Sequence, residues 1–382
     1  MSNSKSKSKT IIFNFDGTGN EPSDAGKVET DESISNVLKL HILLGGGIKD
    51  DKSNTKNGSG GKQIAHYYNG IGTRDSALGQ IPLLGKILSG AKKGINMTVA
   101  PQWGDARKIL REAEQDFNEV GYQKGDILVV TGFSRGAALA RKFASTILNK
   151  HQNCEVSFLG VFDTVAAMDG IHRKGEKISS DVFFENGTLN DRIKKAVHLV
   201  SLDENRISFS PTLINKDNNN SNRILEVWFP GVHSDIGGGY WYDGLSDCAL
   251  AFMIKEMKKA LDKSISIAGG NYASIQKLLD GQGENLYGME VDDIEINPKS
   301  DGVVHRHSGL VVKAGAEPRR ICVNDNDRPS NDLPTLHCSV KERFDKVADY
   351  RPAALRGETF QLLEEDGTKS GPITGIAGLR QS

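Results

Sequence analysis

Six short apolar segments of the chain read as strands, and five of them end in a turn that carries polar residues or glycine. The segments are residues 10–15, 64–71, 126–132, 156–161, 196–202 and 224–229. Helical apolar spacing lies between or after them, at residues 33–44, 105–122, 137–149 and 247–261. Strands that are apolar along their whole length are typical of a parallel sheet covered by helices on both faces. The pattern therefore predicts an α/β fold with a mainly parallel central sheet and its chemistry at the carboxyl ends of the strands.

Charge and composition exclude several classes of protein. Lys and Arg number 48 against 49 Asp and Glu, so a formal net charge of −1 gives no general electrostatic reason to bind nucleic acid. A charged fraction of 25% is ordinary for a globular protein and argues against disorder. No apolar run reaches the ~18 residues of a membrane-spanning helix. The 42 glycines are in excess, and part of that excess falls at the ends of the expected strands.

The length of 382 residues exceeds the ~250–300 at which a single core stops growing. We expect a single α/β domain over residues 10–356 that carries loop and helical insertions. These insertions are expected near residues 45–62, 80–104, 205–222 and 262–335. Residues 1–9 are expected to form a disordered leader, and residues 357–382 a C-terminal tail.

The N-terminus and the cysteines bear on the compartment in which the protein folds. Residues 1–9 are polar and basic, without the apolar region of a signal peptide. The four cysteines are scattered and form no C-x-x-C pair, which argues against a zinc site or a disulfide framework. We expect a protein made in the reducing cytoplasm of the producing cell, which needs a dedicated machine for any export.

A candidate nucleophile lies between one of these strands and the helix that follows it. Residues 132–136 read Gly-Phe-Ser-Arg-Gly, which fits the G-x-S-x-G nucleophile elbow. The flanking glycines relieve crowding in a tight turn, so that the Ser134 hydroxyl projects above the sheet. The alternative is a serine that only caps its helix.

A serine nucleophile needs a base and an acid that orients the base. Of the nine histidines, His233 directly follows the expected last strand, in a loop with Gly237–Gly239. This is the place of the base in the chain order Ser, acid, His. The alternative is a loop histidine that only packs.

The sequence pattern alone does not decide which aspartate is the acid that orients His233. Asp163 ends the strand after the nucleophile strand, and Asp203 ends the next one. Strand counting in the common hydrolase topology favours Asp203. Asp235 lies only two residues beyond His233, and Asp16 ends the first strand.

An oxyanion hole needs two backbone N–H donors. One is expected from Arg135, the residue after the nucleophile, and the other from the loop of Gly17, Thr18 and Gly19. The same loop resembles the phosphatase motif D-x-D-G-T, but Asn14 stands where that motif has its attacking aspartate. The support for a dinucleotide-binding site is also weak, because the loop lacks the third glycine of the G-x-G-x-x-G motif.

Many ordered motifs carry a resemblance to a known family. They are residues 15–20, 33–37, 67–73, 125–141, 158–166, 198–209, 226–241, 245–250 and 336–355. Together they resemble the catalytic domain of the first family of type VI secretion lipase effectors. The resemblance implies an α/β-hydrolase fold and hydrolysis of phospholipids of the phospholipase A1 or A2 kind. By motif match it implies the triad Ser134, Asp163 and His233, which makes Asp203 a structural neighbour of the site.

These features predict a serine ester hydrolase that works through an acyl-enzyme, without a metal or organic cofactor. The resemblance implies a phospholipid or other acyl-ester substrate, a secretion-system or immunity protein as partner, and delivery to the periplasm of a target cell. Residues 81–95 mix apolar residues with Lys86, Lys92 and Lys93, which fits a lid at a membrane surface, and the alternative is a buried helix and loop of the core. Two alternatives are a hydrolase of a non-lipid ester and a non-catalytic recognition or scaffold protein on the same fold.

Overall fold

The computed structural model describes residues 8–47, 57–59, 63–73, 102–166, 189–216, 223–281, 287–306, 315–324 and 330–382. Most of the expected leader, much of the insertions near 45–62 and 80–104, and the expected lid at residues 81–95 lie outside the described residues.

Within the described part of the chain, ten strands form one sheet in the order β10-β9-β8-β7-β6-β5-β4-β1-β3-β2. Neighbouring strands are parallel except for the antiparallel pairs β2–β3 and β9–β10 at the two edges. The α/β fold with a mainly parallel sheet is therefore confirmed. The strands are β1 Thr10–Phe15, β2 Asn57–Ser59, β3 Gln63–Tyr68, β4 Ile127–Phe133, β5 Phe158–Phe162, β6 Ala196–Ser201, β7 Ile224–Phe229, β8 Thr335–His337, β9 Thr359–Leu363 and β10 Ile373–Thr374.

The strand order reverses at β1. The chain leaves β1 toward β3 on one side and returns to β4 on the other. In open α/β sheets a crevice forms outside the carboxyl ends of the strands at such a reversal, and ligands bind there. The loop after β1 and the turn after β4 lie at this point, so residues 16–20 and Ser134 lie side by side at the carboxyl ends of the strands.

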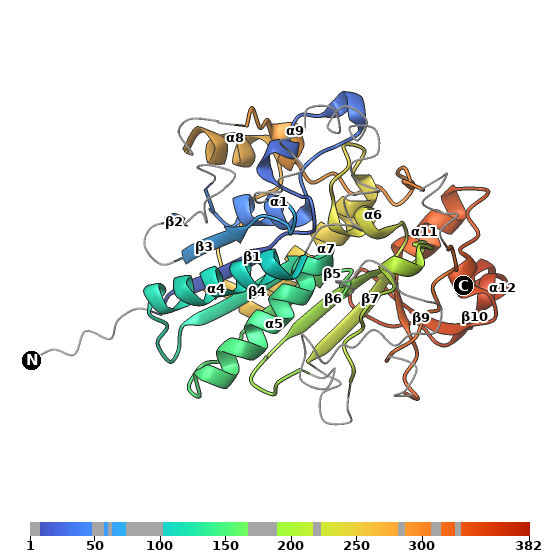
Figure 1. The fold of residues 1–382 in the computed structure, drawn as a ribbon. Helices are drawn as coiled ribbons and strands as arrows, with labels where there is room; N and C mark the ends of the chain where they lie inside the picture. Colours follow the sequence, from blue (N-terminus) through green and yellow to red (C-terminus); the bar gives the residue numbers. More distant parts are fainter. Residues whose placement is uncertain are drawn as a thin grey trace, which may run out of the picture.

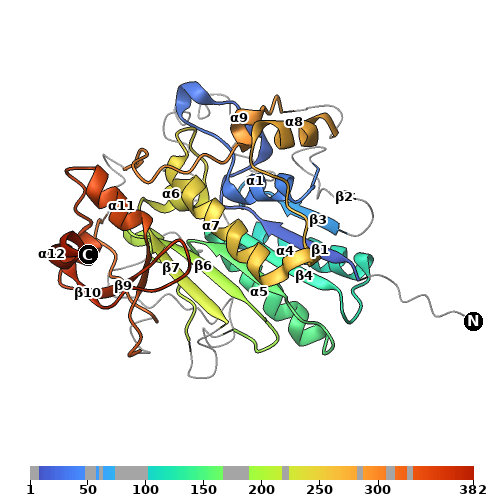
Figure 2. The same cartoon turned by 180° about the vertical axis from the view of Figure 1, so that it is seen from behind.

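Helices cover both faces of the sheet (Figures 1 and 2). Helices α4 and α5 lie over the face in front in Figure 1, and α1 and α7 cover the opposite face, seen in front in Figure 2. The longer helices are α1 Asn36–Leu43, α4 Gln102–Val120, α5 Ser134–Lys150, α7 Gly244–Leu261, α8 Tyr272–Gly281 and α11 Ser339–Lys346. Shorter helices are α6 His233–Gly237, α9 Val291–Ile294 and α12 Gly375–Gln381. Among the described helices, none is both long and apolar enough to cross a membrane.

The alternating direction of side chains along the strands explains why helices cover both faces of the sheet. In β1 the side chains of Ile11, Phe13 and Phe15 pack in the core under α4 and α5, whereas Ile12 packs in the core under α1 and α7. Successive side chains of a strand point to opposite faces. A strand that is apolar at nearly every position must therefore be buried on both.

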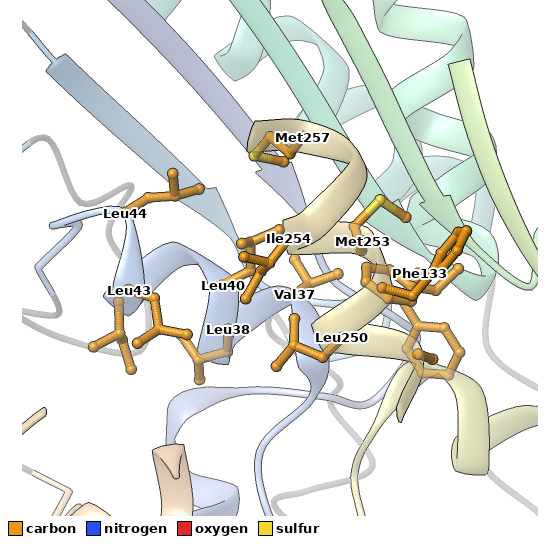
Figure 3. Close-up of a cluster of buried hydrophobic side chains, with 14 of the residues drawn as sticks. Val37, Leu38, Leu40, Leu43, Leu44, Phe133, Leu250, Met253, Ile254 and Met257 are labelled. Atoms are coloured by element: carbon orange, nitrogen blue, oxygen red, sulfur yellow. The ribbon is translucent and has the colours of Figure 1, made fainter. Parts of the chain in front are cut away.

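The core beneath α1 and α7 reaches the candidate site. Figure 3 shows Leu40 of α1 and Met253 and Met257 of α7 packed together, with Phe133 at one side of the cluster. Phe133 is the last residue of β4 and directly precedes Ser134. Apolar burial contributes about 25 cal/mol per Å². The same packing that stabilises the fold thus holds the residue before the candidate nucleophile.

The C-terminal region differs from the expectation of a tail after residue 356. Strand β9 pairs in parallel with β8, and Phe360 is fully buried in a cluster with Trp228 and Leu336. Residues 357–382 thus extend the sheet and add α12. The expectation that residues 224–229 form the last strand is also wrong, because β8, β9 and β10 lie beyond β7.

Candidate active site

Ser134 lies at the junction of β4 and α5 with a φ of 56°, a backbone conformation that residues other than glycine seldom adopt. Strained residues at such a turn persist only where the surrounding structure enforces them, and they cluster at functional sites. The geometry is that of a nucleophile elbow. The expected helix over residues 137–149 begins instead at Ser134, so that the serine itself opens the helix.

The two glycines of the elbow are required by close approach. A Cβ on Gly132 would lie 2.6 Å from the carbonyl oxygen of Gly136. A Cβ on Gly136 would lie 2.1 Å from the carbonyl oxygen of Asp16 and 2.4 Å from that of Phe15. The start of α5 therefore sits directly against the end of β1, which places Ser134 beside the loop after β1.

His233 and Asp163 meet at the same edge of the sheet. His233 opens α6, four residues after β7, and its Nδ1 lies 2.6 Å from Oδ2 of Asp163, which follows β5. The rings of Phe133 and Phe209 flank the imidazole at centroid distances of 4.7 and 4.9 Å. The backbone N–H of His233 donates to Oε2 of Glu204 at 3.2 Å. Ring packing and hydrogen bonds thus fix the orientation of the imidazole.

Two buried atoms at this edge of the sheet stand out. Among the described residues, neither Oγ of Ser134 nor Nε2 of His233 has a hydrogen-bond partner. Buried polar groups are almost always paired, so each unpaired group calls for an explanation. A serine nucleophile and its base use these two atoms. The carbonyl of Ser134 accepts a hydrogen bond from Val165 N–H at 3.2 Å, which ties the elbow to the segment that carries Asp163.

Asp163 is fully buried but strongly stabilised as an anion. Its Oδ1 accepts hydrogen bonds from Nη1 of Arg319 at 2.6 Å and from the N–H of Ser201 at 3.0 Å. Its Oδ2 accepts from Nη2 of Arg319 at 2.9 Å. Burial alone would raise the pKa of Asp163, but the charge of Arg319 and the bond to His233 more than offset it and hold that pKa below its usual range. Asp163 is therefore ionised at neutral pH.

Burial also determines the state of the base. It lowers the pKa of His233 below its ordinary value, although the hydrogen bond and charge of Asp163 act in the opposite direction. The imidazole is therefore neutral at pH 7. A neutral imidazole whose Nδ1–H donates to a carboxylate has its lone pair on Nε2, ready to accept a proton.

The other candidate acids have different partners. Asp203 Oδ2 accepts from the N–H of Gly231 at 2.7 Å and from the Tyr350 hydroxyl at 2.8 Å, and burial raises the pKa of Asp203 to about 6. Asp235 Oδ2 accepts from the N–H of Val232 at 2.8 Å. Of the described carboxylates, Asp163 is the one that hydrogen-bonds the imidazole of His233. Asp203 and Asp235 instead shape the turn between β7 and α6.

Asp16 organises the loop after β1. Its Oδ1 accepts from the N–H of Gly17 at 2.6 Å, and its Oδ2 accepts from the hydroxyls of Ser35 at 2.7 Å and Tyr67 at 2.5 Å. Burial raises the pKa of Asp16 to about 6, although these hydrogen bonds lower it. Asp16 thus acts through the loop and has no bond to His233.

The N–H groups of the loop narrow the choice of oxyanion donor. The N–H of Gly17 is taken by Asp16, and that of Gly19 donates to the carbonyl of Ile71 at 3.1 Å. Within the described residues, the N–H of Thr18 has no acceptor, so Thr18 fits the role better than Gly17. Arg135 is the second residue of α5, and the N–H groups of a first helical turn point out of the end of the helix.

Sequence reasoning missed Arg319 and Glu204 as parts of the site. Arg319 lies in the expected insertion at residues 262–335, in a segment without strand or helix periodicity. Nothing in the residues around it signals that it reaches Asp163. Glu204 is visible in the sequence only as one of several charged residues after β6.

Among the described residues, one group of side chains away from Ser134 has the composition of a metal site. His337, Cys338 and Glu365 each offer one ligand atom within 4.8 Å of the others. However, Nζ of Lys255 lies 3.1 Å from Oε2 of Glu365, and burial raises the pKa of the Cys338 thiol to about 12. A nearby ammonium and a protonated thiol both oppose a cation, so this group carries no metal assignment.

The fold and this geometry define an α/β-hydrolase-like protein with a serine after β4, an aspartate after β5 and a histidine after β7. The family model described as "T6SS, Phospholipase effector Tle1-like, catalytic domain" matches residues 9–150 and 145–256. The chain belongs to this family.

The chain is also similar to solved structures of longer proteins. An uncharacterized protein from Pseudomonas aeruginosa is 22% identical with a TM-score of 0.47, over 77% of this chain and 49% of that one. The Tle1 effector bound to the VgrG spike of the type 6 secretion system is 25% identical with a TM-score of 0.33, over 61% of this chain and 51% of that one. The chain thus spans about half the length of these two relatives. None of the curated proteins compared with the chain matches it.

Proposed function

We propose that this protein is a serine ester hydrolase that cleaves acyl esters of phospholipids through Ser134, His233 and Asp163. The observation that carries the proposal is the combination of a strained serine elbow with a neutral, buried imidazole. That imidazole is oriented by an ionised aspartate and has an unpaired Nε2. Ser134 Oγ is also buried and has no hydrogen-bond partner among the described residues.

Each step of the reaction follows from these groups. Nε2 of His233 takes the proton of Ser134 Oγ as the oxygen attacks the acyl carbonyl. Asp163, bonded to Nδ1 at 2.6 Å, stabilises the imidazolium that forms. The N–H groups of Thr18 and Arg135 bind the oxyanion, a contribution of about 10²–10³ in rate for each donor. The imidazolium then protonates the leaving alcohol, and His233 activates water to release the acyl group.

Family membership supports the phospholipid substrate and the route of delivery. The family description names a phospholipase effector of the type VI secretion system, and one solved relative is a Tle1 effector bound to a VgrG spike. We propose that the chain acts on phospholipid and makes peripheral contact with a membrane during catalysis. We also propose that a secretion-system partner delivers it to a target cell.

The reaction is tested by mass spectrometry of products from vesicles of mixed phospholipids. The proposal expects lysophospholipid and free fatty acid in equal amounts, formed by the wild-type protein and not by Ser134→Ala. The chain that remains on the lysophospholipid distinguishes A1 from A2 cleavage. Hydrolysis of a p-nitrophenyl ester without cleavage of any phospholipid would point to a non-lipid ester as substrate. Absence of both activities in the folded protein would contradict the proposal and favour a non-catalytic recognition role.

A further inference from the structure

Arg319 is a buried cation that the mechanism above does not use. Its guanidinium binds both carboxylate oxygens of Asp163, with Nη1 at 2.6 Å from Oδ1 and Nη2 at 2.9 Å from Oδ2. Two parallel N–H to oxygen bonds of this kind need the planar fork of arginine, which lysine does not have. The side chain of Arg319 is 5% exposed, so water weakens the pair little.

Backbone groups hold the guanidinium in place from the other side. Nη1 also donates to the carbonyl of Ser201 at 2.9 Å and to its hydroxyl at 2.8 Å. Nη2 donates to the carbonyl of Phe209 at 2.5 Å. Arg319 is therefore fixed to the end of β6 and to the turn that follows it, and it transmits that fixed position to Asp163.

The segment that delivers Arg319 is anchored to the same turn. The N–H of Glu317 donates to the carbonyl of Asn205 at 2.8 Å, and Ala316 forms a bridge with Arg206. Residues 315–319 thus lie against residues 205–207. Part of the expected insertion at 262–335 completes the site from outside the core sheet.

Asp163 is a residue that needs such support. Its φ of 38° lies in the left-handed region, where a residue other than glycine is strained, and its side chain is 0% exposed. Its Oδ2 accepts from both Arg319 and His233. The N–H of Ser201 holds Oδ1 as well, but Arg319 bonds both oxygens at once and so fixes the plane of the carboxylate that faces the imidazole.

The charges around His233 give Arg319 a second effect. Asp163 and Arg319 form one ion pair, and Glu204 and Arg206, with Oε2 2.7 Å from Nη2, form another next to the His233 backbone. Behind Thr164, Nε2 of His198 accepts from the Thr164 N–H at 3.0 Å, and Nδ1 of His198 lies at hydrogen-bond distance, 2.8 Å, from Oε2 of Glu226. Two negative and two positive charges cancel in the two ion pairs. Removal of Arg319 would leave a net negative charge beside the imidazole, which favours its protonated form.

We propose that Arg319 is a positioning residue of the active site, which orients the Asp163 carboxylate toward His233 and balances its negative charge beside the imidazole. The inference rests on the proposed function, because it gives His233 the role of the base. It adds a residue from outside the Ser-Asp-His set.

The test compares Arg319→Met and Arg319→Lys with Arg320→Met. Arg320 is the neighbouring arginine, its side chain is 72% exposed, and it pairs with Glu358 at 3.2 Å, so it is a matched control. The rate of Ser134 labelling by a fluorophosphonate is measured from pH 5 to 9, and the imidazole of His233 is titrated by NMR. The second measurement needs neither turnover nor a known substrate.

For Arg319→Met, the proposal expects the midpoint of the labelling profile and of the His233 titration to rise by about 1 pH unit or more. Arg319→Lys keeps the charge and loses the fork, so its midpoint stays nearer to that of the wild type while its maximal labelling rate falls. Arg320→Met leaves both quantities unchanged.

Two results would overturn the inference. One is a folded Arg319→Met variant that keeps the wild-type midpoint and labels more slowly at every pH, since that is what a purely structural role predicts. If Arg319→Met fails to fold, the test rests on Arg319→Lys. A maximal labelling rate of Arg319→Lys equal to that of the wild type would then overturn the inference. A wild-type protein that is never labelled contradicts the proposed function instead, and the NMR titration of His233 still tests Arg319.

Discussion

Replacement of Asp163 by asparagine, compared with the same change at Asp203, tests which carboxylate serves His233. The two residues end neighbouring strands, and both are buried, but their surroundings differ. Asp163 is an anion between a permanent cation and the imidazole. Asp203 accepts two hydrogen bonds on a single oxygen, and its raised pKa of about 6 means that the protein tolerates its neutral form.

The magnitudes follow from those contacts. In Asp163→Asn the side-chain amide offers one acceptor oxygen where the carboxylate offers two, so either Arg319 or His233 faces an amide NH₂ group. Loss of one partner from a buried ion pair costs about 3–5 kcal/mol of folding stability. In a catalytic triad the same change lowers kcat by about 10⁴, because the imidazole is then held in the wrong tautomer. In Asp203→Asn the amide oxygen can still accept from Gly231 and Tyr350, so we expect a stability at pH 7.5 within about 1 kcal/mol of the wild type and activity within about threefold of it.

The assay is hydrolysis of a p-nitrophenyl ester at pH 7.5, with urea unfolding of each variant to exclude a folding defect. The expected result is a nearly inactive Asp163→Asn and a nearly normal Asp203→Asn. The reverse order, in variants that both fold, would refute the assignment of the acid and with it the role given to Arg319.

The remaining predictions concern packing and pH. Gly136→Ala places a Cβ 2.1 Å from the carbonyl of Asp16, so α5 must move by about 1.3 Å to reach the 3.4 Å of an ordinary contact, and we expect a loss of at least 1–3 kcal/mol and of about 10² in activity. The control is Gly104→Ala in α4, where an added Cβ would have no neighbour within 4 Å, and we expect it to be neutral or stabilising by up to about 1 kcal/mol. Equal unfolding midpoints for Gly136→Ala and Gly104→Ala would contradict the packing described for the elbow. Because the folded-state pKa of Asp203 is raised to about 6, its stabilising contribution is complete below about pH 4 and is lost as the pH rises toward 6, at about 1.4 kcal/mol per pH unit. Asp203→Asn should remove that slope from urea unfolding measured at pH 4.5, 5.5 and 7, and an unchanged slope would show that Asp203 does not titrate in this window.

The parts of the site that the sequence predicted are those set by local pattern. Gly132 and Gly136 bracket Ser134 between an apolar strand and a helix, so the elbow is visible in five consecutive residues. His233 is recognisable because it follows a strand closely and has several glycines nearby. For β1, β4, β5, β6 and β7 the apolar runs are long enough that burial on both faces could be read directly.

The parts that it did not predict depend on contacts between distant residues. Asp163 and Asp203 both end buried strands, so the residues alone do not decide between them, and only the family resemblance favours Asp163. The contact that distinguishes Asp163 is with His233, 70 positions later in the chain. Arg319 reaches Asp163 across 156 positions from a segment of irregular structure. Strand β8 has three residues and the edge strand β10 has two, too few to show any alternation, and so the sequence pattern did not reveal that the sheet continues beyond β7.

The central claim is that Ser134 is an activated nucleophile, and covalent labelling by a fluorophosphonate tests it most directly. The protein is treated with the probe at pH 7.5, and its peptides are mapped by mass spectrometry. We predict one equivalent of label on the peptide that contains Ser134, none in Ser134→Ala, and a strongly reduced rate in a His233→Ala variant that remains folded. No label on Ser134 in the folded wild-type protein, or equal labelling after loss of His233, would contradict the account.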